Sequence, residues 1–320
     1  MSEKKMTSIG GQAVIEGVMM RGPHKTAVAV RKPDGEIIID EKETKNIGKW
    51  AKIPIIRGCV SFVSSMVTGV QALMFSAKFF DVEEEEKPKK ENKNAGAGPV
   101  SANKKDENNK EESIPTWMLY LSVVLAVGMS VGLFIVLPNL ISNIFVPNRE
   151  SNSVIYNLVE SIVKIIIFLG YLMLVSKMKD IQRTFEYHGA EHKTIFCYEN
   201  GEELTVENVK KYSRFHPRCG TSFLLFVVII SIIVFSIVGV HESAIINMGL
   251  RLLLLPLVAG ISYEIIKFAG KSKSKCVTWL NAPGKWLQRL TTREPDESQI
   301  EVAIASLKAV IPENEDDDRW

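Results

Sequence analysis

The sequence predicts an all-α membrane protein of about four transmembrane helices that carries a small α+β cap on the cytoplasmic side. Two observations lead to this fold class. Charged residues make up 24% of the chain, yet almost none fall in four long apolar blocks, and the mean hydropathy is still +0.07. Outside those blocks, β-rich runs and amphipathic stretches have the pattern of a folded soluble part. A wholly disordered chain is therefore excluded, and a purely soluble one is disfavoured.

The apolar blocks set the number of spans. The first runs over about 21 residues without a charge, which on a helix is roughly 31 Å, the thickness of the hydrocarbon core of a bilayer. Trp117 and Tyr120 begin it, as aromatic rings do at a membrane interface, and Pro138 is expected to mark its far end. The predicted spans cover residues 117–137, 154–175, 222–240 and 244–266.

A few ionisable residues interrupt these spans. Glu160 and Lys164 are four positions apart, so on a helix they can neutralise one another as an ion pair. Arg251 is expected to anchor the bundle or to pair within it. Glu264 lies near the cytoplasmic end of the last span, where an ionisable group is a functional candidate unless Lys267 simply pairs with it.

Basic residues in the short loops set the orientation, because cytoplasmic loops carry an excess of Lys and Arg. The loop between the first two spans holds only Arg149, whereas residues 176–221 hold eight basic residues. Seven more lie within residues 267–293, after the last span. Both termini and the central loop are therefore expected in the cytoplasm, where cysteines stay reduced as free thiols or metal ligands.

Outside the spans, three kinds of segment are expected. Residues 26–30 and 36–39 flank Pro33-Asp34-Gly35, a turn sequence that predicts a hairpin. Residues 54–80 are apolar with polar interruptions and indicate one or two helices on the membrane or against the spans, with a fifth span left open. Helices are also expected within 279–290 and 299–310, and the acidic residues 313–318 are expected to be a solvated tail.

The resulting organisation has six parts. The charged linker has almost nothing to bury and is expected to be a flexible tether. In chain order the parts are an N-terminal cytoplasmic segment (1–82), the linker (83–114), a first transmembrane pair (115–175), a cytoplasmic loop (176–221), a second transmembrane pair (222–266) and the C-terminal cytoplasmic helices with the acidic tail (267–320).

The central loop carries an H-x-x-E-H arrangement formed by His188, Glu191 and His192. On a helix the two imidazoles lie one turn apart on one face, where they can hold one metal ion, and the carboxylate beside them can take a proton from a bound water. The same spacing occurs in inverted zincins. His216 and Cys219, in a turn before the third span, offer a further imidazole and thiolate to an ion such as zinc.

Two interpretations of this cluster stay open at the level of the sequence. A catalytic metal site needs an open position for water, and Glu191 would then be the general base. With three or four protein ligands and no open position the site would be structural, and without any metal the same residues would be polar groups of a cytoplasmic cap.

Several function classes are excluded or disfavoured by the rest of the sequence. Lys and Arg total 39 and Asp and Glu total 37, a net charge of +2, so nothing indicates nucleic-acid binding. No phosphate-binding loop, dinucleotide fingerprint or serine nucleophile elbow is present. The basic N-terminus has no apolar core after it, so a cleavable signal peptide is not expected.

Four blocks of sequence strongly resemble the YqhQ-like family of bacterial multi-pass membrane proteins, whose function is unknown and whose members are often labelled predicted metal-dependent enzymes. The blocks are GGQAVIEGVMMRGP (10–23), YHGAEHKT (187–194), HPRCGTS (216–222) and LTTREP (290–295). The resemblance implies a protein of the bacterial plasma membrane with a suspected metal site. It also adds Glu16 and Arg21 to the candidate residues, since a carboxylate can join a metal shell and a guanidinium can hold an anionic group.

Two functions from different classes follow as expectations. The first is a metal-dependent hydrolase at the cytoplasmic membrane face, in which His188, His192, His216 and Cys219 bind zinc. Glu191 would be its general base, and Arg21 or Arg218 would steady developing negative charge. Its substrate could be a peptide, a lipid headgroup or a nucleotide. The alternative is a non-catalytic scaffold or biogenesis factor whose basic cap docks a cytoplasmic protein, a ribosome or the translocon, and a transporter is a weaker third option.

Overall fold

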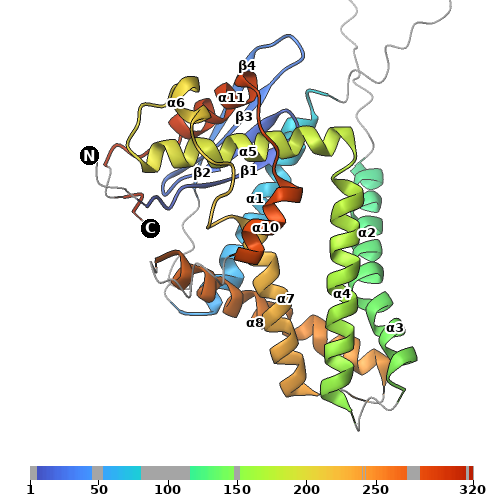
Figure 1. Ribbon diagram of the computed structural model, residues 1–320. Coiled ribbons are helices and arrows are strands. Elements are labelled where there is room, and N and C mark those ends of the chain that lie inside the picture. Colours follow the sequence, from blue (N-terminus) through green and yellow to red (C-terminus); the bar gives the residue numbers. More distant parts are fainter. Residues whose placement is uncertain are drawn as a thin grey trace, which may run out of the picture.

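A computed structural model describes residues 6–44, 53–80, 116–147, 152–239, 241, 243–271, 282–314 and 317–319. The linker expected at 83–114 and Cys276 lie outside these residues. Figure 1 shows two parts: a cap, in which the sheet and several helices gather, and long apolar helices that run away from the cap. The described residues are mostly helical, in agreement with the predicted fold class.

The apolar part contains five helical runs, one of them built from three consecutive elements. They are α1 (Ile56–Ala77), the run α2 (Thr116–Val131), η3 (Gly132–Val136) and α3 (Leu137–Phe145), then α4 (Ser153–Val175), α7 (Gly220–Val238) and α8 (Ala244–Lys271). Within the part of the chain that the structure describes, four stretches are long and apolar enough to cross a membrane, namely Ile56–Ala77, Val124–Phe145, Ser153–Val175 and Ile245–Phe268. In α7 the stretch that meets the apolar criterion among the described residues is shorter, Phe226–Val238.

The first span differs from its prediction, because Pro138 does not end it. The helix continues through this proline to Phe145. One wide turn, the π-helical η3, precedes the proline, and the N–H of Leu137 donates to the carbonyl of Gly132. A π-turn changes the backbone spacing ahead of a proline ring that an α-helix cannot accommodate, so the chain stays helical.

Residues 56–77 form one helix, which contacts both parts of the molecule. At its N-terminal end α1 crosses α8 closely, because a Cβ built on Gly58 would lie 2.9 Å from the backbone of Gly260. At its other end Ala72 and Phe75 pack against the sheet. The sequence had left open whether this segment is one helix or two, and the structure shows a single one.

The cap contains a four-stranded antiparallel sheet in the order β1-β2-β3-β4. Its strands are β1 (Gly10–Val14), β2 (Gly17–Arg21), β3 (Lys25–Arg31) and β4 (Ile37–Glu43). The hairpin predicted around Pro33-Asp34-Gly35 is therefore confirmed as β3 and β4. It is extended by a second hairpin from the segment 10–21, so the sheet is larger than the sequence indicated.

Four further helices lie in or next to the cap, namely α5 (Lys179–Glu199), α6 (Val206–Lys210), α10 (Ala282–Thr291) and α11 (Glu297–Lys308). Two of them, α5 and α11, pack against the sheet. Val18 and Met20 on the sheet share one hydrophobic core with Ala190 of α5 and Ile300 of α11. Segments far apart in the sequence, before α1, between α4 and α7, and after α8, thus form a single body, as predicted for the cap (Figure 1).

The charged residues inside the apolar helices are paired, as the sequence predicted for most of them. Glu160 in α4 contacts Lys164 at 2.9 Å and also forms an ion pair with Arg251 of α8. Glu264 pairs with Arg57 of α1. An unpaired charge in such surroundings would be costly, so removing one partner of a pair would destabilise the protein.

The acidic C-terminal end is a solvated tail only in part, because Glu313 and Asp317 are exposed but Asp318 is not. Asp318 is buried and accepts hydrogen bonds from the hydroxyls of Thr7 and Tyr198, each at 2.8 Å. Thr7 also forms a β-bridge with Arg319. Asp318 can be buried because the Thr7 and Tyr198 hydroxyls donate to its carboxylate. The sequence does not show that these residues lie near one another.

Candidate metal centre

The H-x-x-E-H segment lies in the middle of α5, and the helix confirms the predicted one-turn spacing. The ring centroids of His188 and His192 are 4.4 Å apart. Gly189 lets this helix approach the chain after α10, because a Cβ there would lie 2.0 Å from the carbonyl oxygen of Arg293. The side of α5 that carries the histidines can therefore pack against the end of α10.

Each of the two histidines is held by a backbone carbonyl. His188 Nδ1 lies 2.8 Å from the carbonyl oxygen of Thr291, and His192 Nδ1 lies 2.5 Å from that of Arg214. A carbonyl oxygen only accepts hydrogen bonds, so both Nδ1 atoms carry the proton. When both rings are neutral, as metal ligands must be, their Nε2 atoms present lone pairs, which is the arrangement that metal-binding histidines use. Burial lowers the pKa of His188, but the Cys219 sulfur and the Glu191 carboxylate outweigh burial and raise this pKa to about 9.

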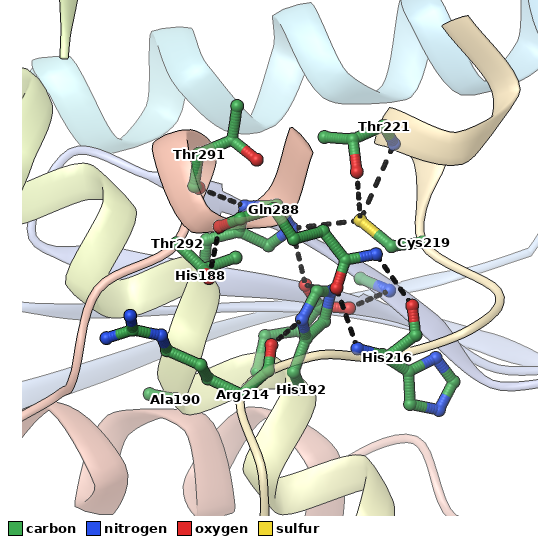
Figure 2. Close-up of polar contacts among 12 residues, drawn as sticks. His188, Ala190, His192, Arg214, His216, Cys219, Thr221, Gln288, Thr291 and Thr292 are labelled. Carbon is green, nitrogen blue, oxygen red and sulfur yellow. Dashed lines mark hydrogen bonds and ion pairs between the residues drawn. The ribbon is translucent and has the colours of Figure 1, made fainter. Parts of the chain in front are cut away.

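Cys219 brings a sulfur to the same place from α7. It is the N-cap of that helix, and its Sγ lies 3.2 Å from His188 Nε2. The N–H and the hydroxyl of Thr221 donate to the sulfur at 3.5 and 3.4 Å (Figure 2). Burial raises the pKa of the Cys219 thiol, but His188 and His192 outweigh burial and hold this pKa well below its usual value.

Among the described residues, His188, His192 and Cys219 form a group whose ligand atoms all lie within 4.8 Å of one another. Two imidazole nitrogens and a thiolate are donors that suit zinc, whose tetrahedral ligand atoms lie roughly 3.5 Å apart for a nitrogen and a sulfur. The 3.2 Å between Sγ and Nε2 is close to that spacing. The donor set therefore fits zinc with three protein ligands and one further position.

Glu191 faces the same point without belonging to that group. Its Oε2 lies 3.9 Å from His188 Nε2 and 4.0 Å from His192 Nε2. Its other oxygen accepts a hydrogen bond from the N–H of Gly11 in β1 at 3.0 Å. A Cβ on Gly11 would lie 2.9 Å from Glu191 Cγ, so only glycine leaves room for the acid. Burial raises the pKa of the Glu191 carboxyl.

His216, the fourth metal ligand expected from the sequence, lies beside the group but outside it. Its ring centroid is 5.6 Å from that of His192, and Figure 2 shows its ring to one side of Cys219. Its Nδ1 accepts from the N–H of Arg218 at 3.3 Å, and its Nε2 lies 3.6 Å from the Glu199 carboxylate. Burial lowers the pKa of His216 to about 4, so the ring is neutral.

Arg218 lies in the wall of the site with its guanidinium already engaged. It forms an ion pair with Glu199 and donates to the carbonyl oxygen of Thr7 at 3.1 Å. Glu199 also accepts from the N–H of Thr7 at 2.9 Å. These contacts join the N-terminal segment to the end of α5.

The other three candidates lie elsewhere. Glu16, in the turn between β1 and β2, pairs with Arg183 of α5 and accepts from the Tyr187 hydroxyl at 3.2 Å. Arg21 lines a cavity of about 820 Å³ between the sheet and α1. Glu264 links α8 to α1 through Arg57. None of the three lines the cavity at the histidines.

That cavity has a volume of about 450 Å³ and is lined by His188, Glu191, His192 and Cys219 together with the N-terminal segment 7–13. Residue spacing in the sequence did not predict that segment 7–13 lines the site. The feature that could have indicated it is the pair Gly10-Gly11, which the sequence analysis used only as part of the family resemblance. The carbonyls of Thr291 and Arg214 were also missed, because a backbone acceptor has no signature in the sequence.

Comparison with known proteins agrees with the resemblance seen in the sequence. Residues 53–313 match the family model described as a protein of unknown function (DUF1385). The chain is 34% identical over 318 residues to the uncharacterised protein YqhQ of Bacillus subtilis (strain 168), covering 97% of this chain and 95% of that protein. No solved structure matches. The chain therefore belongs to the DUF1385 family.

Proposed function

We propose that this protein is a zinc-dependent hydrolase at the cytoplasmic face of the bacterial plasma membrane, with His188, His192 and Cys219 as the metal ligands. One observation carries the proposal. Two imidazoles with their Nδ1 protons fixed on carbonyls present Nε2 lone pairs where the Cys219 sulfur lies, and an acid faces the same point. A purely structural site would not need that acid.

The ligand count favours catalysis over a closed structural site. Structural zinc sites in proteins have four protein ligands, whereas catalytic ones have three and leave a position for water or substrate. Three ligand residues form the group here, and a cavity of about 450 Å³ opens beside them. A bound zinc ion would supply a Lewis acid at that position.

Glu191 is the general base in this proposal. Its Oε1 is fixed by the N–H of Gly11, so its Oε2 is turned toward the two Nε2 atoms at 3.9 and 4.0 Å. That separation is too long for a direct hydrogen bond, so neither imidazole holds Oε2. A carboxylate held in this way can take a proton from water and return it to a leaving group.

We also propose that four helical runs cross the membrane and that α1 lies along its surface. The cap draws on the sheet, on α5 and on α11, which share one hydrophobic core. Segments on one side of a membrane are separated by an even number of crossings. The run α2–α3 with α4 supplies two crossings before α5, and α7 with α8 supplies two more. A crossing by α1 would make the number before α5 odd.

The experiment that tests the site measures zinc and hydrolysis separately. The full chain, purified in detergent, is expected to contain about one zinc per molecule and to hydrolyse 4-nitrophenyl acetate. His188→Ala and Cys219→Ala should lose the metal, while His24→Ala and Cys59→Ala, which remove a histidine and a thiol outside the group, should keep it. Glu191→Gln should keep the metal and lose about a hundredfold or more in hydrolysis.

Two results would contradict the proposal. A wild-type protein without zinc after growth in zinc-supplemented medium would remove the metal site. Loss of zinc from Glu191→Gln would make the acid a fourth ligand and the site a closed structural one, which would favour the scaffold function.

A further inference from the structure

A second cavity, the α1 cavity, lies between the sheet and α1. Its volume is about 820 Å³, within the range of roughly 300–1,000 Å³ that ligand pockets occupy. The wall that the sheet supplies includes Arg21 and Lys42, and the wall that the helix supplies includes Val67, Val70 and Met74. The α1 cavity therefore joins a charged surface to an apolar one.

Arg21, at the end of β2, is a half-buried cation in this cavity. Within the described ranges its guanidinium forms no ion pair and donates no hydrogen bond. Burial lowers the pKa of Arg21, but an arginine stays protonated in proteins. Lys42, by contrast, is neutralised by Asp40 at 2.6 Å. The Glu43 carboxylate also lines the cavity but is exposed, where water screens it. Arg21 is thus available to an anion from outside the chain.

The helix wall of the cavity belongs to an exposed apolar stripe of α1. Val63, Val67, Val70 and Met74 follow one face of the helix, and their exposed fractions range from 38% for Met74 to 57% for Val63. Exposed apolar side chains at helical spacing are typical of a helix that lies in a membrane interface. Figure 1 shows α1 running from α8 to the sheet. With α1 at the membrane surface, as proposed above, the cavity lies at the level of the lipid headgroups.

A ligand that fits both walls needs an anion and an apolar chain. A guanidinium binds phosphate oxygens through two parallel N–H bonds, and basic pockets at the cytoplasmic membrane face hold phosphate headgroups. A soluble phosphate would pair with Arg21 but would leave Val67 and Val70 in water. A phospholipid covers these side chains with its acyl chains, which lowers the free energy by about 25 cal/mol for each Å² of apolar surface buried.

We propose that the α1 cavity binds an anionic phospholipid of the inner leaflet, with its phosphate on Arg21 and its acyl chains against Val67, Val70 and Met74. This inference does not depend on the metal centre. It rests only on the surface position of α1 that is proposed above. A lipid held in this way would fix the sheet of the cap to the membrane at a second place, apart from the transmembrane helices.

The test uses the full chain in detergent micelles, phosphatidylglycerol as the probe and native mass spectrometry to count bound lipids. The fraction of protein that carries one lipid, followed as lipid is added, gives an apparent Kd. Arg21→Gln should weaken binding about tenfold or more, because it removes the charge-assisted bonds to the phosphate. Arg21→Lys keeps the charge but loses the paired N–H groups, so it should bind with intermediate affinity.

Lys25→Gln is the matched control for the charge. It removes a cation four positions away that pairs with Glu41 and does not line the cavity, so it should bind the lipid like the wild type. Val67→Ser tests the apolar wall and should also weaken binding. Its control is Val63→Ser, which lies one turn earlier on the same stripe but outside the cavity. The melting temperatures of the variants show that they are folded.

Two further probes test the ligand on the wild-type chain. Diacylglycerol with the same acyl chains lacks the phosphate, and it should bind about tenfold more weakly than phosphatidylglycerol. Inorganic phosphate lacks the acyl chains, and at millimolar concentration it should not displace the lipid. Together these probes distinguish a phospholipid from a free phosphate as the source of the anion.

Several results would overturn the inference. Equal affinity of Arg21→Gln and Lys25→Gln would mean that Arg21 does not hold the phosphate. Equal affinity for diacylglycerol would make the cavity a purely apolar groove, and displacement by inorganic phosphate would make it a site for a free anion. Labelling of Ile53→Cys by an impermeant thiol reagent added to intact cells would remove the surface position of α1 and the inference with it. Absence of zinc or of ester hydrolysis, by contrast, would contradict the proposed function alone.

Discussion

Gly10 and Gly11 are neighbours in β1 but have different surroundings. A Cβ on Gly11 would lie 2.6 Å from the carbonyl oxygen of Met19 and 2.9 Å from Glu191 Cγ, whereas a Cβ on Gly10 meets nothing within 4 Å. Gly11→Ala is therefore expected to displace Glu191 and to cost about 1–3 kcal/mol of unfolding free energy through overpacking. Gly10→Ala should leave stability nearly unchanged. Thermal unfolding of both variants in detergent measures the difference, and equal melting temperatures would contradict it.

Residue spacing predicted part of the candidate site and failed for the rest in a consistent way. His188 and His192 come together because helical periodicity fixes their relation, and Cys219 joins them because it begins a helix that packs beside α10. His216, three residues before Cys219, depends on how the turn at Pro217 directs its ring, and spacing does not fix that direction. Arg21 and Glu16 were nominated by resemblance alone, and each lies away from the cavity at the histidines.

The contact between α1 and α8 depends on a glycine in each helix. A Cβ on Gly260 would lie 2.6 Å from the carbonyl oxygen of Ile55, at the start of α1, whereas Gly249 of the same helix has nothing within 4 Å. Both Gly→Ala changes raise helix propensity by about 1 kcal/mol. The difference between the two variants in unfolding free energy therefore reports the contact of Gly260 with α1. Gly260→Ala is expected to melt lower than Gly249→Ala by the equivalent of about 1–3 kcal/mol.

The melting temperatures of the two variants are measured in micelles of the same detergent. A Gly260→Ala variant as stable as Gly249→Ala would mean that α1 does not lie against α8 in the folded protein.

Elements were easier to predict from the sequence than their limits. The apolar blocks predicted the long apolar helices, and the Pro-Asp-Gly turn predicted one hairpin. The second hairpin was missed as such, since segment 10–21 is rich in glycine and methionine and has little of the β-branched pattern that marks a strand. Pro138 misled the prediction because a π-turn lets a helix continue through a proline.

The arrangement of the whole chain makes a prediction about membrane topology. In intact cells, a membrane-impermeant maleimide should label Asn152→Cys, between α3 and α4, and should leave Ile53→Cys and Lys78→Cys, at the two ends of α1, unlabelled. The native thiols that the structure describes, Cys59, Cys197 and Cys219, should also stay unlabelled. Permeabilised cells provide the control that each introduced cysteine can react. Labelling of Ile53→Cys from outside would show that α1 crosses the membrane.

The sequence predicted that the cap would combine three distant segments, but not how they are joined. Positive charges predict that these segments lie on one side of the membrane, and this prediction depends only on counting Lys and Arg. Their packing depends on long-range contacts, such as the carbonyl of Arg293 against Gly189, that composition does not encode. Secondary structure was thus within reach of the sequence, whereas the shape of the cavity was not.

The bond between Thr7 and Asp318 joins residues 311 positions apart, so nearly the whole polypeptide must be made before the cap can close. The strand that carries Gly11 must wait until the residues around Asp318 have been made. The wall of the histidine pocket that this segment forms can consequently be fixed only late in synthesis.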